Sequence, residues 1–596
     1  MQGDLSEGSA LDKTIRYRRF LLIVAGLGGL LYGVDVGIIG GALPYLEATS
    51  GLDASQLSMI VAAVLLGSVI STLFAGVMAD WMGRKPLMVL SGFAFVLSVP
   101  LIALSHSYGA LFFGRLLQGV SGGFIGVVVP LYLAECLVAS NRGKGTGIFQ
   151  WLLTLGIVLA ALISIYYSYR VEEVAKLANA GNLLSFEDQA WRRIFWVSLP
   201  PGILFVIGSL MVTESPRWLF RRGRIEAARI ALLRSRTPAR AEIELSEMAQ
   251  VAAEGKKTSA GRVVKDSLLR RKYVVPFLLA CVILFCNTAT GINSIIGYNA
   301  NILLQSGLSD VEAHWGYVVF TLVNFLVTIV GLMIVDRKGR KFLLGIGSAG
   351  IILSLSITGI LFLGTERLRI DRRDAVQGMV GPDQSLTLRF DQAEAAKLIG
   401  ASNSIDAGKA TLSVIYSYAG FTGQSNIARS YDKAAPIKIN RAGSIPTNKV
   451  EAFFRNPFGN VDAARTAPLK IEEALISPVP NRQHGWMVAL SLYCFMAFFA
   501  IGPGVCVWLA LSELMPTRIR SNGMSIALVI NQLVSTTFAA LFLPVVGQYG
   551  YSTVFFAFAA FTVIYFVTAV FFLPETKGKT LEEIEEYFEN PKLGRA

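Results

Sequence analysis

The chain has 596 residues, of which 53% are hydrophobic and 16% charged, and its mean hydropathy is +0.54. A soluble fold of this length cannot bury that much apolar surface, so the composition excludes a soluble globular protein and indicates a protein of the lipid bilayer. The net charge of +13 does not predict a nucleic-acid partner, because basic residues are also the expected excess in the cytoplasmic loops of a membrane protein.

Apolar stretches long enough to cross the hydrocarbon core, which takes about 20 helical residues, recur along the chain in two sets of six. The first set lies near residues 20–44, 57–79, 86–104, 109–134, 145–168 and 193–213. The second set lies near 273–304, 315–335, 342–364, 486–511, 523–547 and 551–573. Only helices satisfy the backbone across spans of this kind. We therefore predict an all-α, multi-pass membrane protein with twelve transmembrane helices in two six-helix halves.

The short loops predict the orientation of these helices. The loops after Pro44, Leu104, Leu304 and Val546 contain no Lys or Arg. The alternate loops carry basic residues, which are Arg84 and Lys85, Arg142 and Lys144, Arg337 to Lys341, and Arg518 and Arg520. Because basic loops stay on the cytoplasmic side, we expect both termini, residues 1–19 and 575–596, to be cytoplasmic. The halves are then 20–213 and, for the second, 273–364 with 485–574.

Two polar regions separate these parts. Residues 214–272 are Arg-rich, with a helix-like stretch at 225–234, and are expected to form a cytoplasmic helical linker. Residues 365–484 are polar and rich in Gly, Pro, Asn and Ser, and the alternation of loops places them outside the membrane. Within this insert the segments 412–418 and 471–476 are candidates for order, and a loop this long is normally either functional or disordered. We expect the insert to cap the outer vestibule.

An internal repeat supports a duplicated bundle. The same turn follows the second and the eighth span, first as Asp80, Gly83, Arg84 and Lys85 and then as Asp336, Gly339, Arg340 and Lys341. Each turn alone could be an ordinary topology signal, since basic residues favour helix ends at the inner leaflet. Equivalent positions in both halves indicate two parallel repeats, as in carriers that open alternately to the two sides.

Asp35 lies inside the first span, where an ionisable side chain is costly and indicates function. Arg115, in the fourth span, lies at a compatible depth and is its natural partner. Such a pair can alternate between an ionised, salt-bridged form and a protonated form that releases the arginine, which would couple proton binding to helix movement. The alternative is a fixed ion pair that only sets helix packing.

Further motifs accompany the repeat. They are Pro130 to Glu135 with Arg142 and Gly143, Glu214 to Arg217, Glu513 to Pro516 with Arg520, and Pro574 to Glu583. Together with the repeated turns, they resemble the sugar porter family of the major facilitator superfamily over essentially the whole chain except the insert. Thr213 stands where the family usually has a proline.

The resemblance implies a secondary carrier for a sugar or polyol. It implies that cytoplasmic charges lock the two halves in the outward-facing state. The matching residues are Asp80, Arg84, Glu135, Arg142, Glu214, Asp336, Arg340, Glu513, Arg520 and Glu575. Proton-coupled members resemble this chain in having Asp35 and Arg115, so the resemblance favours proton symport.

Neutral polyols are bound through uncharged hydrogen-bonding groups and an aromatic face. The family's pattern places such groups at Gln150, Asn287, Thr288, Asn293, Asn324, Gly504, Trp508 and Asn531. Taken singly, an Asn or Gln in a membrane helix is as often a contact between helices, and Trp508 could be an interfacial anchor. Asn287 and Thr288 replace a usual pair of glutamines, and Gly297 replaces a tyrosine. These changes favour a substrate other than an ordinary hexose.

Four other readings remain open at this point. The chain could be a facilitative sugar carrier or a carrier of a non-sugar molecule. It could be a nutrient sensor that keeps the carrier fold, and the least favoured reading is an enzyme within the insert. No metal site and no cofactor is expected, and the family resemblance allows a monomer. The absence of Asn-x-Ser/Thr acceptors favours a bacterial inner membrane.

Overall fold

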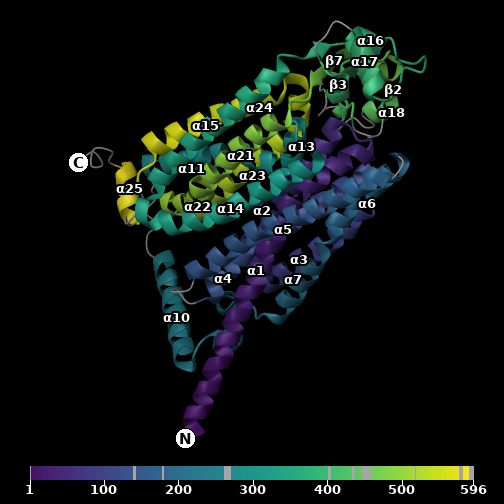
Figure 1. The fold of residues 1–596 in the computed structure, drawn as a ribbon. Coiled ribbons are helices and arrows are strands. Elements are labelled where there is room, and N and C mark those ends of the chain that lie inside the picture. The colour runs from purple at the N-terminus through teal and green to yellow at the C-terminus, as the bar shows by residue number, and fades with distance from the viewer. Residues whose placement is uncertain are drawn as a thin grey trace.

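The computed structural model describes residues 2–137, 142–177, 180–260, 270–400, 405–431, 436–445, 456, 459–516, 519–575 and 581–589. Within these residues, twelve helical spans are long and apolar enough to cross a membrane, which confirms the predicted architecture of two six-helix halves (Figure 1). The first half contains α1 (Gln2–Ser50), α2 (Ala54–Met82), α3 (Arg84–Ala103), α4 (Tyr108–Cys136), α5 (Arg142–Leu177), and α6 (Ala180–Trp196) with α7 (Leu199–Met211).

The second half is interrupted more often. Its spans are α11 (Arg271–Ala289) with α12 (Ile292–Gly297), α14 (Asp310–Lys338), α15 (Arg340–Glu366), α21 (Arg482–Ile501) with α22 (Pro503–Leu514), α23 (Arg520–Tyr549), and α24 (Tyr551–Val567) with a π-helical turn at Thr568–Phe572. A short helix, α13 (Asn299–Gln305), follows α12. The breaks come at Gly291, whose φ of 82° suits glycine, and at Gly502.

The fifth and sixth spans differ from their predicted limits. α5 runs to Leu177 and the sixth span begins at Asn182, whereas the apolar runs cover only 145–168 and 193–213. The added turns are polar but locally paired. Lys176 contacts Glu172 one turn earlier at 2.8 Å, and pairs at this spacing stabilise an exposed helix. Hydropathy alone therefore underestimates both helices.

The repeated turns are structural equivalents. Gly83 ends α2 and precedes α3 with a φ of 105°. Gly339 ends α14 and precedes α15 with a φ of 89°. Both values lie in the region that glycine alone adopts readily. The sequence repeat thus becomes the same tight helix-to-helix connection in each half.

Two groups of helices lie at the end of the bundle away from the insert (Figure 1). The linker forms α8 (Pro216–Arg221), α9 (Ile225–Ser235) and α10 (Pro238–Ala260), and α25 (Leu581–Glu589) is the last helix that the structure describes. The Arg236 side chain, which is 3% exposed, contacts Glu244 on α10 at 2.9 Å and donates to the carbonyl of Cys136 at 2.8 Å. The linker is therefore fastened to the end of α4.

The insert is a folded α/β unit at the opposite end (Figure 1), so the chain is not helical throughout. One sheet has the order β1–β7–β3–β4 with β5 also on β3, and β2 pairs with β6. Its strands are β1 (Ile370–Asp371), β2 (Leu386–Leu388), β3 (Ala410–Tyr418), β4 (Phe421–Gln424), β5 (Ala428–Arg429), β6 (Ile437–Ile439) and β7 (Lys470–Pro478). Its helices include α16 (Arg373–Gln377), α17 (Gln392–Ile399), α18 (Arg441–Ser444) and α20 (Val461–Thr466).

The two segments suggested for order become the centre of this sheet. Residues 412–418 lie in β3 and 471–476 in β7, which pair antiparallel. β3 and β4 form a hairpin through Ala419 and Gly420, both at positive φ, as a two-residue loop of this twist requires. The unit has a hydrophobic core of its own, to which β3 contributes Leu412, Val414, Tyr416 and Tyr418. The polar composition of the remaining residues concealed this unit.

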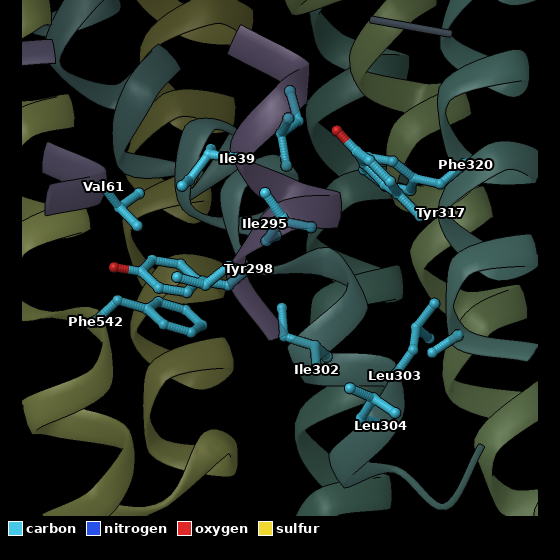
Figure 2. Close-up of a cluster of buried hydrophobic side chains, with 14 of the residues drawn as sticks. Ile39, Val61, Ile295, Tyr298, Ile302, Leu303, Leu304, Tyr317, Phe320 and Phe542 are labelled. Carbon is cyan, nitrogen blue, oxygen red and sulfur yellow. The ribbon is translucent and has the colours of Figure 1, made fainter. Parts of the chain in front are cut away.

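The halves meet at the insert end through an apolar cluster (Figure 2). Figure 2 shows Val61 and Ile39 of the first half facing Ile295 and Tyr298 of the second. The ring of Tyr298 stacks on Phe542 with centroids 4.4 Å apart, and its hydroxyl lies 3.2 Å from the Ser58 hydroxyl. The structure therefore holds this end of the bundle closed.

Candidate functional site

An acid and a base meet inside the first half. The side chains of Asp35 on α1 and Arg115 on α4 are 0% and 1% exposed, and Nη1 of Arg115 lies 3.7 Å from Oδ1 of Asp35. The same Nη1 donates a hydrogen bond of 2.7 Å to Oε1 of Gln118, one turn along α4. The guanidinium also lies 5.5 Å from the ring centre of Phe195. The structure brings together the two residues for which the sequence predicts proton coupling.

The Asp35 carboxylate is poorly stabilised as an ion. Within the described part of the chain, neither of its oxygens accepts a hydrogen bond, and 3.7 Å to Arg115 is too long for one. A buried carboxylate needs hydrogen bonds as well as a counter-charge to offset its lost hydration. Gly122 permits the close approach of α4, since a Cβ there would lie 3.0 Å from Oδ2. The site can therefore accept a proton and lose few favourable contacts.

Three of the predicted substrate residues lie where α11 and α12 pack on α23. Thr288 Oγ1 donates to the backbone carbonyl of Asn531 at 3.1 Å, and Asn531 Nδ2 donates to the carbonyl of Leu284 at 2.9 Å. On α12, Asn293 Nδ2 donates to Ser535 Oγ at 2.6 Å. In this conformation the three side chains join the seventh span to the eleventh, which is the structural alternative that the sequence left open.

Two more predicted substrate residues lie on facing helices of opposite halves. Gln150 on α5 and Asn324 on α14 are half-buried. The aromatic residues next to them, Trp151 and Phe325, have ring centres 5.6 Å apart, so α5 and α14 pack together at this level. The remaining predicted residues are Asn287, which is buried on α11, Gly504, which is half-buried at the start of α22, and Trp508, whose side chain lies outside the described residues.

A buried charge cluster connects α2, α3, α4 and the linker. The Arg84 side chain is 2% exposed and forms two contacts of 2.9 Å with the Glu135 carboxylate. It also contacts Asp80 at 3.0 Å, and its backbone N–H donates to Glu214 at 3.0 Å. Burial raises the pKa of the Glu214 carboxyl above its ordinary value, although hydrogen bonds from the backbone N–H groups of Ser215, Lys85 and Arg84 lower it. These residues of the predicted charge network share one site.

The second half repeats part of this arrangement. The Glu575 carboxylate accepts hydrogen bonds from the backbone N–H groups of Arg340 and Lys341, each at 3.2 Å. This is the position that Glu214 takes beside Arg84 and Lys85. These contacts join residues of one half, and they do not join the two halves to each other. The side chains of Arg142, Asp336, Glu513 and Arg520, also predicted for the network, lie outside the described residues.

Comparison with known proteins agrees with this geometry. The family model described as "Sugar (and other) transporter" matches residues 21–377 and 475–588. The chain belongs to this family. Its relatives in the family are membrane transporters, so this sugar transporter family member is not an enzyme. The match omits 378–474, which contain most of the α/β unit.

Individual relatives span nearly the whole sugar transporter family member. The glucose transporter GlcP of Staphylococcus epidermidis is 26% identical over 575 residues, which cover 96% of this chain and 97% of the relative. The human proton myo-inositol cotransporter is 26% identical over 587 residues, covering 97% and 83%. A partially occluded inward open structure of the xylose transporter XylE from E. coli has a TM-score of 0.61 at 17% identity, covering 93% and 99%, and shows the shared fold.

Sequence reasoning missed several residues at these sites of the family member. Gln118 bonds Arg115 from three residues away, a spacing that could have revealed it. Ser215 donates to Glu135 at 2.5 Å. Its place in the motif after Glu214 did not indicate this contact. Asp310 and His314, at the start of α14, contact α1 and α5. They lie four residues apart on one helix face, but their partners lie in the other half.

Proposed function

We propose that the protein is a secondary active transporter that takes up a sugar or polyol together with a proton by alternating access. The observation that carries the proposal is the Asp35 carboxylate, which is fully buried, accepts no hydrogen bond within the described residues and lies 3.7 Å from Arg115. An acid held in this way favours the neutral form unless its counter-charge moves closer. It is suited to bind and release one proton per cycle.

The proton acts through Arg115. With Asp35 ionised, the guanidinium is held between the acid and Gln118, because one Nη1 faces both. With Asp35 neutral, the attraction between the helices that carry the pair weakens, and Arg115 is left with Gln118 and the ring of Phe195. Movement of α1 relative to α4 then depends on the charge of Asp35. This dependence couples proton binding to the movement of the halves.

Alternating access requires one end to close while the other opens. The insert end is closed here by the cluster around Tyr298 and Phe542. The charge clusters of Arg84 and Glu575 lie at the other end, and we assign that end to the cytoplasm because the basic loops and the linker lie there. Both termini would then be cytoplasmic, the insert would be extracytoplasmic, and the protein would act as a monomer in a bacterial inner membrane.

The substrate class follows from the relatives and the pocket. The relatives include a glucose transporter and a proton myo-inositol cotransporter. Asn293 and Asn324 each bond one neighbouring side chain but are only half-buried, so part of each amide is open to hydroxyl groups. Asn531 is buried and bonds the carbonyl of Leu284. The predicted substrate positions are rich in amides and hydroxyls and include no cation among the described side chains, which fits a neutral polyol better than an organic acid.

A facilitative carrier is the second candidate, because Asp35 and Arg115 could also be a fixed packing pair. Purified protein in liposomes would be screened with radiolabelled hexoses, pentoses and inositols, with and without an inward proton gradient. Gradient-driven accumulation by wild type, lost in Asp35→Asn while exchange is retained, supports symport. Equal, gradient-independent equilibration by both proteins would establish the facilitator, and no uptake of any compound would favour a sensor or a non-sugar carrier.

A further inference from the structure

A second group of ionisable side chains lies at the insert end, between the halves. Asp310 and His314 are on the first turns of α14, in the second half. The Tyr45 hydroxyl of α1 donates to Asp310 Oδ2 at 2.9 Å, and the Ser168 hydroxyl of α5 donates to the same oxygen. The ring of Tyr45 also stacks on His314 with centroids 5.4 Å apart and planes 6° apart. The first half thus contacts this pair from two helices.

The surroundings of His314 favour a protonated ring. The side chain is 0% exposed, Nδ1 lies 2.8 Å from the carbonyl oxygen of Asp310, and Nε2 lies 3.2 Å from the carbonyl oxygen of Gly41 on α1. A carbonyl oxygen only accepts hydrogen bonds, so the doubly protonated imidazolium is the form of the ring that can bond both carbonyls at once. The Asp310 carboxylate, 3.4 Å from Nδ1, supplies the counter-charge.

The contact between the halves at the insert end, around Tyr298 and Phe542, is called the insert-side gate below. We propose that His314 is a second proton-binding site, which keeps this gate closed while it holds its proton. The imidazolium donates across the halves to Gly41, and the carboxylate that balances it accepts from Tyr45 and Ser168 across the same interface. Nδ1 keeps its proton because the carbonyl and the carboxylate of Asp310 both face it. Loss of the other proton turns Nε2 into an acceptor that faces the carbonyl oxygen of Gly41. A hydrogen bond between the halves is replaced by repulsion, and the gate opens.

The sign of the effect follows directly. The closed gate is the form that binds the proton, so low pH on the insert side favours closure and high pH favours opening. Five other ionisable side chains among the described residues lie around Asp310 and His314. They are Tyr45 and Glu47 on α1, the latter accepting from Asn301, Tyr169 on α5, Glu187 on α6 near Tyr45, and Glu312 on α14, which pairs with Arg482.

This inference concerns gating, and its test needs no substrate or transport. Ser58, which is buried and bonds Tyr298 and the backbone N–H of Leu543 across the halves, would be replaced by cysteine. Its labelling by a membrane-impermeant maleimide, applied from the insert side, reports opening. Labelling is divided by that of Thr387→Cys on an exposed position of β2, which corrects for the pH dependence of thiol reactivity.

We expect normalised labelling to rise as the outside pH goes from about 6 to about 9. The parent protein here is the one that carries Ser58→Cys alone. When His314→Gln is added to it, labelling at about pH 6 should be about tenfold higher than in the parent, because a charge-assisted hydrogen bond between the halves is lost. Labelling of this variant should not rise with pH. Asp310→Asn should shift the rise to lower pH, and it provides the test if His314→Gln does not fold.

The chain contains a matched control. Both ring nitrogens of His484 also lie near carbonyl oxygens, those of Ser306 at 3.2 Å and Leu361 at 3.1 Å, but both partners belong to the second half. His484→Gln should therefore keep the parent's labelling and its pH response. The proposal is overturned if parent labelling is independent of pH, if His314→Gln keeps the parent response, or if His484→Gln behaves like His314→Gln.

Discussion

Replacement of Arg84 by glutamine should destabilise the protein far more than the same change at Arg221. Both arginines bond the same carboxylate oxygen of Glu135, at 2.9 and 3.1 Å, but their side chains are 2% and 57% exposed. Removing the buried partner leaves Glu135, itself 8% exposed, without its main counter-charge, which costs about 3–5 kcal/mol. Loss of an exposed partner costs about 0–1 kcal/mol because solvent replaces it.

The assay is the apparent melting temperature of each variant in detergent, followed by tryptophan fluorescence. We expect a fall of several degrees for Arg84→Gln and almost none for Arg221→Gln. The double variant Arg84→Met with Glu135→Met should be less destabilised than the sum of its single changes, because no unpaired charge remains buried. Equal shifts for the two arginines, or additive shifts in the double variant, would refute this account of the cluster.

Three further predictions concern single positions. Gly339→Ala should lower the melting temperature and the expressed amount, because its φ is 89° and a Cβ would lie 2.5 Å from the Glu575 carboxylate. Asn531→Ala should destabilise by about 0.5–1.5 kcal/mol, since the carbonyl of Leu284 on α11 loses one of its donors. If the melting temperature is unchanged but substrate affinity falls, the residue is a ligand. Gln118→Leu should shift the pH profile of uptake without loss of folding, because Arg115 loses its alternative acceptor; an unchanged profile would contradict this role.

The membrane fold could be predicted from the sequence because its signals are local. Each span is a run of apolar residues. The turns at Gly83 and Gly339 have the same residue types and the same backbone conformation. The pairing of Asp35 with Arg115 was also accessible, because two costly charges at similar depth leave few possible partners. These features need no knowledge of how distant helices pack.

The α/β insert and the contacts of the Asp310–His314 pair could not be predicted from the sequence, because they depend on partners far away along the chain. β3 pairs with β7, and Leu412 lies opposite Ile476, 64 residues further along the chain (476 − 412). No local pattern specifies such a partner. Nothing in the sequence distinguishes His314 from an ordinary buried histidine. Its role becomes visible only in the structure, where its ring faces the carbonyl of Gly41 on the other half. Thr288 and Asn531 fit a substrate site by motif, yet their bonds in this structure are between helices.

Proton movement driven by substrate tests the central claim most directly. Liposomes containing the protein and a trapped pH-sensitive dye would be given, on the outside, a sugar or polyol that the protein takes up, with no imposed proton gradient and with potassium and valinomycin to clamp the voltage. Substrate entry through wild type should acidify the interior, and Asp35→Asn should exchange labelled substrate without any change in dye signal. Substrate entry through wild type with no acidification would contradict proton symport.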